Sequence, residues 1–166
     1  LSFESERLLA ERIGKPVEEV TDIEVVDLPK AGRERETLVK IRVNQSFFRK
    51  AVLAAYDFKC CITGLGVPEL LNASHIIPWS KDEVNRVNPR NGLCLNAIHD
   101  RAFDRGLLTI TPDFRIKISK SIKRNEADFA LQDFLFQYDG AEIKAPTRFL
   151  PDAKFLKYHN KSVFKA

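Results

Sequence analysis

Residues 60–106 read CCITGLGVPELLNASHIIPWSKDEVNRVNPRNGLCLNAIHDRAFDRG, and this stretch decides the fold. The run at 60–63, closed by Gly64 and Gly66, and the segment 71–77, which stops at Pro78, predict two short strands of a hairpin. After a polar loop, residues 95–104 have the spacing of a helix, and Gly106 stands where such a helix would end. The stretch therefore predicts two strands followed by a helix.

The flanking sequence predicts further helices and a second hairpin. The expected elements are a helix over 44–56 with Asn44 as its N-cap, a β-hairpin of 107–110 and 114–118, a helix over 126–138 and a last short helix near Phe155 and Tyr158. Helices and short antiparallel hairpins are segregated in this order, so the predicted fold class is α+β.

The start of the chain is set apart from the rest. Residues 2–13 have apolar residues at roughly helical spacing, and the charged stretch 30–36 is typical of a solvated linker. We therefore expect an N-terminal helical segment with its linker over 1–34 and one main domain over 35–166. The 166 residues contain no Met, so we expect a piece of a longer protein, with 1–34 as the end of an upstream domain.

Composition excludes several classes of protein. The chain is 44% hydrophobic and 30% charged, as in ordinary soluble domains, and no apolar run is long enough for a transmembrane helix. No signal peptide is visible, and three Cys cannot form a disulfide framework or a four-ligand zinc site. We therefore expect a cytoplasmic protein. The net charge of +4 permits nucleic-acid binding without arguing for it.

Several separate motifs resemble those of the HNH endonucleases, a ββα-metal nuclease family. They are a C-x-x-T-G stretch ending at Gly64, H-I-x-P-W from His75, N-G-L-x-L from Asn91 and F-D-x-G-L from Phe103. They come in the order found in the restriction-type branch, and the resemblance extends over residues 35–164. It implies a ββα-metal core of short hairpin plus helix, flanked by helices and a second β-hairpin. It also implies a metal-dependent DNA endonuclease that hydrolyses phosphodiester bonds, as the nuclease module of a restriction or defence protein.

The same resemblance implies catalytic and metal-binding residues. His75 is expected to be the general base, because a neutral imidazole can take a proton from water, and Asn91 is expected to brace the loop that presents it. Asp100 ranks first as metal ligand, since it stands nine residues after Asn91, where the family commonly has a histidine. Asp104 ranks second because it shares a helix face with Asp100, and His99 ranks third. Two carboxylates favour Mg²⁺ or Mn²⁺, and no structural zinc is expected because the paired CxxC motifs are absent.

Other interpretations remain open. Ser74 stands where many family members have a metal-binding Asp or His, so the chain could be a catalytically degenerate nucleic-acid-binding module. A purely structural interaction domain, with His75 and Asp100 buried by chance, is the second alternative. Asp104 could brace a loop or helix end instead of binding metal, and Trp79 could be a packing residue.

The expected partners follow from the same resemblance. The basic residues expected to contact DNA phosphates are Lys81, Arg86, Arg90, Arg101 and Arg105. An upstream recognition or sensor domain is expected in the full-length protein, and a homodimer is expected because many restriction nucleases cut both strands as dimers. No membrane partner is expected.

Overall fold

The structure, a computed structural model, describes residues 32–123 and 128–166. The chain divides into two compact units, Leu1–Arg42 and Val43–Ala166, and all residues that line the pocket belong to the second. The helix predicted over residues 2–13 lies outside the described residues.

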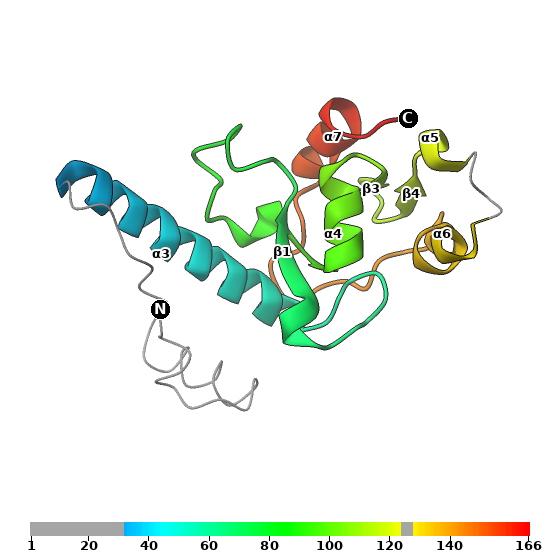
Figure 1. Cartoon of the computed structure of the whole chain (residues 1–166), viewed down its shortest axis with the longest axis horizontal. Coiled ribbons are helices and arrows are strands. Elements are labelled where there is room, and N and C mark those ends of the chain that lie inside the picture. Colours follow the sequence, from blue (N-terminus) through cyan, green and yellow to red (C-terminus); the bar gives the residue numbers. More distant parts are fainter. Residues whose placement is uncertain (1–31, 124–127) are drawn as a thin grey trace. The chain divides into compact units, whose positions relative to one another are not determined.

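Two short strands and the helix after them form the centre of the second unit. β1 (Leu71–His75) pairs antiparallel with β2 (Gly92–Asn96), and in this register His75 lies opposite Gly92. α4 (Ala97–Asp104) follows β2 directly and packs against both strands, next to β1 in Figure 1. The α+β class and the core of hairpin plus helix are therefore confirmed.

The strand predicted over residues 60–63 is wrong, because residues 61–63 form a turn, and Cys60, Cys61 and Ile62 are buried without strand pairing. The Cys61 N–H donates to the Cys94 carbonyl of β2 at 2.8 Å, so the segment lies beside the hairpin without joining it as a strand. A short apolar run indicates that a segment is buried, but it does not by itself distinguish a strand from a turn. The pattern also placed residue 95 in the helix, whereas Asn96 caps α4 by accepting the His99 N–H at 2.9 Å.

α3 (Gly32–Ala55) is longer than the helix predicted over 44–56, and Asn44 lies inside it instead of capping its start. No Gly or Pro interrupts residues 33–43, so nothing in the sequence ends the helix before Asn44. The domain boundary predicted at residues 34 and 35 falls in the first unit, and the division into domains stays a prediction.

The second hairpin is present as predicted. β3 (Leu108–Ile110) pairs antiparallel with β4 (Ile116–Ile118), and all but one of their residues are buried. After α5 (Lys120–Lys123), the helix predicted over 126–138 is shorter and broken: Asp128 caps α6, and a 3₁₀ turn, η3, follows. Their bounds are Phe129–Phe134 and Phe136–Tyr138. Two further 3₁₀ turns, η1 (Pro68–Leu70) and η2 (Pro89–Asn91), precede β1 and β2.

α7 (Ala153–Ser162) is the last helix, where one was expected. Its His159 is buried, stacks on Phe103 of α4 at 3.7 Å and shares a 2.8 Å hydrogen bond with Thr109 of β3. The chain end then covers Gly106, whose φ of +69° ends α4 as predicted. α7 therefore fixes α4 in place. Within the described residues no helix is long and apolar enough to cross a membrane.

Candidate active site

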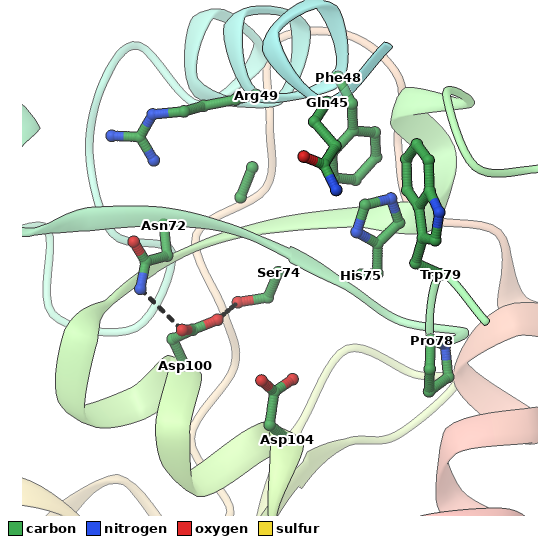
Figure 2. Close-up of a pocket in the computed structure, with 11 residues that line it drawn as sticks. Gln45, Phe48, Arg49, Asn72, Ser74, His75, Pro78, Trp79, Asp100 and Asp104 are labelled. Atoms are coloured by element: carbon green, nitrogen blue, oxygen red, sulfur yellow. Dashed lines mark hydrogen bonds between the residues drawn. The ribbon is translucent and has the colours of Figure 1, made fainter. Parts of the chain in front are cut away.

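A pocket of about 560 Å³ opens between the end of α3, β1 and α4 in the second unit. Figure 2 shows side chains from all three elements around it. The lining residues are Gln45, Phe48, Arg49, Asn72, Ala73, Ser74, His75, Pro78, Trp79, Asp100 and Asp104. His75, Asp100 and Asp104, which the sequence singled out, thus share one pocket.

His75 is held in one orientation at the end of β1. Its ring stacks on Phe48, with the two ring centroids 3.7 Å apart. It lies nearly perpendicular to the ring of Trp79, with the centroids 5.5 Å apart. Its Nε2 lies 2.8 Å from the Arg86 carbonyl oxygen. A carbonyl can only accept, so Nε2 carries the proton and Nδ1 has a free lone pair. In Figure 2 Nδ1 faces the pocket interior, on the side of Asp100 and Asp104.

Burial keeps this imidazole neutral. Loss of solvation lowers the pKa of His75 below its usual 6.5, and the hydrogen bond to Arg86 offsets only part of that effect. At neutral pH Nδ1 is therefore unprotonated and able to accept a proton from water.

Asn91 ties down the segment that follows His75. It is 1% exposed, and its Oδ1 accepts the Ile77 N–H at 2.8 Å while its Nδ2 donates to the Ile77 carbonyl at 3.2 Å. Nδ2 also lies 3.4 Å from the Asn85 carbonyl oxygen in the next loop. Its own carbonyl accepts the Ile76 N–H at 2.9 Å. These contacts join the end of β1 to the start of β2.

Gly92, opposite His75 in the hairpin, allows α3 to approach closely. A Cβ at this position would overlap the Val52 side chain and lie 2.9 Å from Cζ of Phe48. Phe48 is the ring that stacks on His75. The absence of a side chain at Gly92 is therefore what lets Phe48 pack against the imidazole.

The two carboxylates lie one turn apart on α4. Asn72 Nδ2 donates to Asp100 Oδ2 at 2.7 Å, and the Ser74 hydroxyl donates to Asp100 Oδ1 (Figure 2). Burial, and then the nearby charge of Asp100, raise the pKa of Asp104. Neither carboxylate forms an ion pair with a described lysine or arginine. Ser74 thus acts as a hydrogen-bond donor that orients Asp100.

This donor set fits a hard divalent cation. No group of three His, Cys, Asp or Glu side chains is clustered as a complete metal site in the described part of the chain. Asp100 and Asp104 do offer two oxygen ligands on one face of α4, and the charge of Asp100 raises the free energy of the charged form of Asp104. A cation between them would relieve that repulsion, with water and phosphate oxygens completing the shell.

His99 does not reach the pocket. Its side chain is 1% exposed, Nε2 lies 2.6 Å from the Phe134 carbonyl oxygen and Nδ1 lies 3.9 Å from Cys60 Sγ. One residue of helix rotates a side chain by about 100°, which turns His99 into the core and Asp100 into the pocket. Its third rank as a ligand therefore has no support from the geometry.

The basic residues divide into two groups. Four are exposed and do not line the pocket: Lys81, Arg90, Arg101 and Arg105. Arg86 is different, since its side chain is 29% exposed and its guanidinium stacks over Trp79 at 5.2 Å.

Sequence reasoning gave no role to Arg49, which lines the pocket. Its Nη1 donates to the Leu71 carbonyl at 2.7 Å and its Nη2 to the Pro68 carbonyl at 3.2 Å, so its position is fixed while other N–H groups remain available. Gln45 lines the same wall. The signal was present: Gln45, Phe48 and Arg49 are spaced three and four apart, on one face of a helix.

Two comparisons with known proteins agree with this geometry. Residues 60–111, which contain β1, β2 and α4, match the family model described as HNH endonuclease. The solved structure titled "Modification dependent TagI restriction endonuclease" is similar with a TM-score of 0.51 and 21% identity. The similarity covers 70% of this chain and 37% of that chain, and at this identity it shows a shared fold. No curated protein matches. The family model supports the HNH family and, at the level of the family, nuclease activity, while the structural similarity supports the fold.

Proposed function

We propose that this chain is the metal-dependent DNA endonuclease module of a restriction protein. One observation carries the proposal: the unprotonated Nδ1 of His75 faces the same pocket as the carboxylates of Asp100 and Asp104. Phosphodiester hydrolysis needs a base beside a water molecule and a positive charge beside the phosphate. The pocket offers a base and a place for a cation from opposite sides.

His75 would act on the attacking water. Nδ1 takes one proton from the water as its oxygen attacks phosphorus, and Nε2 keeps its proton on the Arg86 carbonyl throughout. The resulting imidazolium then releases the proton to solvent or to the leaving oxygen. The stacked Phe48 and the edge of Trp79 hold the ring in line for this transfer.

Asp100 and Asp104 would hold Mg²⁺ or Mn²⁺, with Asn72 and Ser74 orienting Asp100. When bound, the metal would stabilise negative charge on the phosphate and leaving oxygens. Arg49 would bind a phosphate oxygen from the α3 side through its unused N–H groups. It supplies positive charge that the sequence-based set of phosphate contacts did not include.

DNA is the proposed substrate, with Lys81, Arg90, Arg101 and Arg105 contacting phosphates outside the pocket. The region of similarity covers only 37% of the restriction enzyme structure that this chain resembles. We therefore propose that target recognition resides in a separate module. We also propose that two copies act together to cut both strands and that the protein works in the cytoplasm.

The test is cleavage of supercoiled plasmid with Mg²⁺, with Mn²⁺ and with a chelator. We expect cutting with either metal and none with chelator. The double substitution Asp100→Asn with Asp104→Asn keeps side-chain volume and removes both charges, so it should abolish metal-dependent cutting.

A second candidate function rests on Ser74, whose hydroxyl is bonded to Asp100 and is a weak metal ligand. In that case the chain is a degenerate nucleic-acid-binding module. Salt-sensitive DNA binding without cutting under either metal would favour this function and contradict the nuclease.

A further inference from the structure

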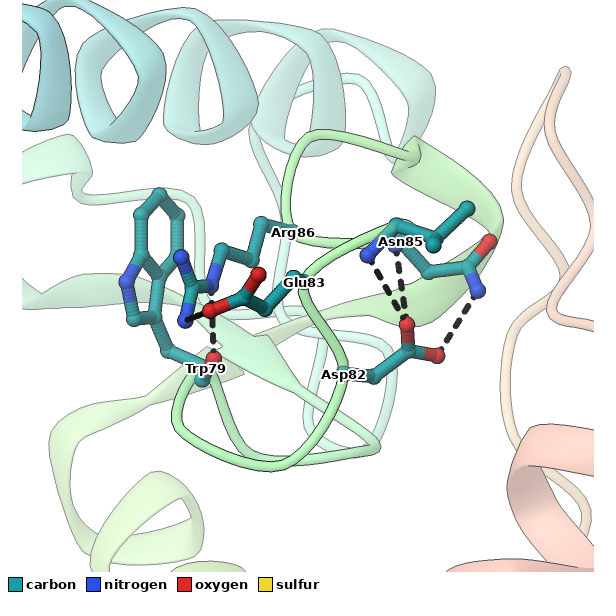
Figure 3. A network of polar contacts seen from close by, with 6 residues as sticks. Trp79, Asp82, Glu83, Asn85 and Arg86 are labelled. Atoms are coloured by element: carbon teal, nitrogen blue, oxygen red, sulfur yellow. Dashed lines mark hydrogen bonds and ion pairs between the residues drawn. The ribbon is translucent and has the colours of Figure 1, made fainter.

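The loop between His75 and Asn91 is stiffened by its own side chains (Figure 3). Asp82 Oδ1 accepts the N–H groups of Val84 and Asn85, each at 3.1 Å, and Oδ2 accepts from Asn85 Nδ2 at 2.7 Å. Asn88 Nδ2 then donates to Asn85 Oδ1 at 3.0 Å. The backbone on the N-terminal side of Arg86 is thereby fixed in a turn.

Arg86 itself closes the loop onto Trp79. Its Nε donates to the Trp79 carbonyl at 2.9 Å, its Nη2 pairs with Glu83 at 3.2 Å, and its guanidinium lies over the indole ring (Figure 3). Glu83 is 83% exposed, so the ion pair itself contributes little. The carbonyl and the ring of Trp79 are therefore the contacts that matter.

The same residue contacts the proposed base. The Arg86 carbonyl accepts Nε2–H of His75 at 2.8 Å, and Trp79 meets the His75 ring edge-on. Arg86 thus contacts the imidazole through its own carbonyl, and its side chain contacts Trp79, which packs against the same imidazole.

We infer that Arg86 is a positioning residue: its guanidinium, clamped on Trp79, holds its own carbonyl at His75 and so fixes the imidazole as the Nε2-protonated tautomer. This inference rests on the proposed function for its purpose, which is to keep the Nδ1 lone pair in the pocket. It replaces the expectation that Arg86 contacts DNA phosphates.

The protonation of each ring nitrogen can be observed directly. Protonated and unprotonated imidazole nitrogens differ widely in ¹⁵N chemical shift, so NMR of the histidine rings reports the tautomer without any nuclease assay. The chain has three histidines. In His99 and His159, as in His75, Nε2 lies against a backbone carbonyl, at 2.6 and 3.2 Å. These two rings are internal controls, and His75→Gln assigns the third.

The variants are Arg86→Met and Arg86→Lys, with Arg148→Met, an exposed arginine outside this loop, as the matched control. Neither Met nor Lys has an Nε–H in a planar fork, so both should lose the clamp. We expect the His75 signals of both variants to shift towards a mixture of tautomers, while His99, His159 and the control variant stay unchanged. If Arg86→Met does not fold, Arg86→Lys decides alone.

Activity and binding measurements separate positioning from DNA contact. Positioning predicts that the single-turnover rate of both variants falls by about 10- to 100-fold. DNA affinity measured without metal should stay within about two-fold, with an unchanged dependence on salt.

Unchanged His75 tautomers in both variants would overturn the inference. So would weaker DNA binding in Arg86→Met with a salt slope reduced by about one, since that identifies a phosphate contact. Shifted tautomers in a protein that cuts no DNA under any metal would support the positioning role and refute the nuclease.

Discussion

Replacing Asn91 by alanine should damage catalysis far more than stability. The substitution removes the 2.8 Å hydrogen bond from the Ile77 N–H, together with longer bonds to the Ile77 and Asn85 carbonyls at 3.2 and 3.4 Å. Leaving one buried donor unpaired costs about 1–3 kcal/mol. For a chain of this size each kcal/mol lowers the melting temperature by about 2–4 °C. The melting temperature should therefore fall by several degrees.

The effect on rate should be larger because Asn91 holds the backbone just after His75. A displacement of the base by about 1 Å lowers the rate by about 10²-fold. Single-turnover cleavage, measured well below the melting temperature, should fall at least that much. Asn91→Asp keeps an oxygen for the Ile77 N–H but sets a carboxylate against two carbonyl oxygens, so it should not restore activity.

Asn160→Ala is the matched control. Asn160 of α7 also makes three hydrogen bonds, to Thr109 Oγ1 at 3.1 Å and to the carbonyls of Ile110 and Leu156 at 2.7 Å each. It lies outside the pocket lining. We expect a decrease in melting temperature with nearly normal cutting. Equal residual activity in Asn91→Ala and Asn160→Ala would refute the bracing role of Asn91.

Three further predictions concern the same site. Asp100→Ala should weaken Mn²⁺ binding in calorimetry, whereas His99→Ala should leave it nearly unchanged; the opposite result would exchange their roles as ligands. Burial lowers the pKa of His75 below 6.5, so the neutral form of its imidazole already predominates at pH 6.5. The cleavage rate should fall only as pH drops through this lowered pKa, and a rate still rising steeply between pH 7 and 8 would argue against His75 as base. Gly92→Ala should lower stability by about 1–3 kcal/mol through overpacking against Phe48, measured by denaturant unfolding, and should also slow cutting; a fully stable, fully active variant would contradict the close packing.

The helix that carries the carboxylates was predictable because its signals are local. Asn96 caps it, Gly106 ends it in a left-handed conformation, and Asp100 and Asp104 share one face by spacing alone. The second hairpin was equally clear, since apolar and polar residues alternate along both of its strands, on either side of a proline-containing turn.

The pairing of the first hairpin was not predictable from local pattern. Leu93, Cys94 and Leu95 are all buried, so β2 lacks the alternation that marks a strand with one exposed face. The apolar run at 60–63 looked more like a strand, yet it forms turns beside Cys94. Only the fold as a whole decides which of two apolar runs becomes the partner of β1.

The roles of single side chains depended on tertiary contacts as well. Nothing in the sequence distinguishes Arg86 from Arg90, but in the structure one is stacked on Trp79 and the other is exposed. Arg49 lines the pocket because the end of α3 lies beside β1, and its helical spacing with Gln45 and Phe48 shows a shared face without showing what that face packs against. The motifs therefore indicated where the site lies, whereas the role of each side chain became clear only from its tertiary contacts.

The most direct test of the nuclease mechanism is the single-turnover cleavage rate of His75→Ala, with DNA affinity measured in parallel on the same preparation. A general base acts on the transition state and contributes little to binding of the substrate. We predict a rate about 10²- to 10⁴-fold below that of the unmodified protein, with DNA affinity nearly unchanged. Cutting by His75→Ala at close to the unmodified rate would contradict the assignment of His75 as the base.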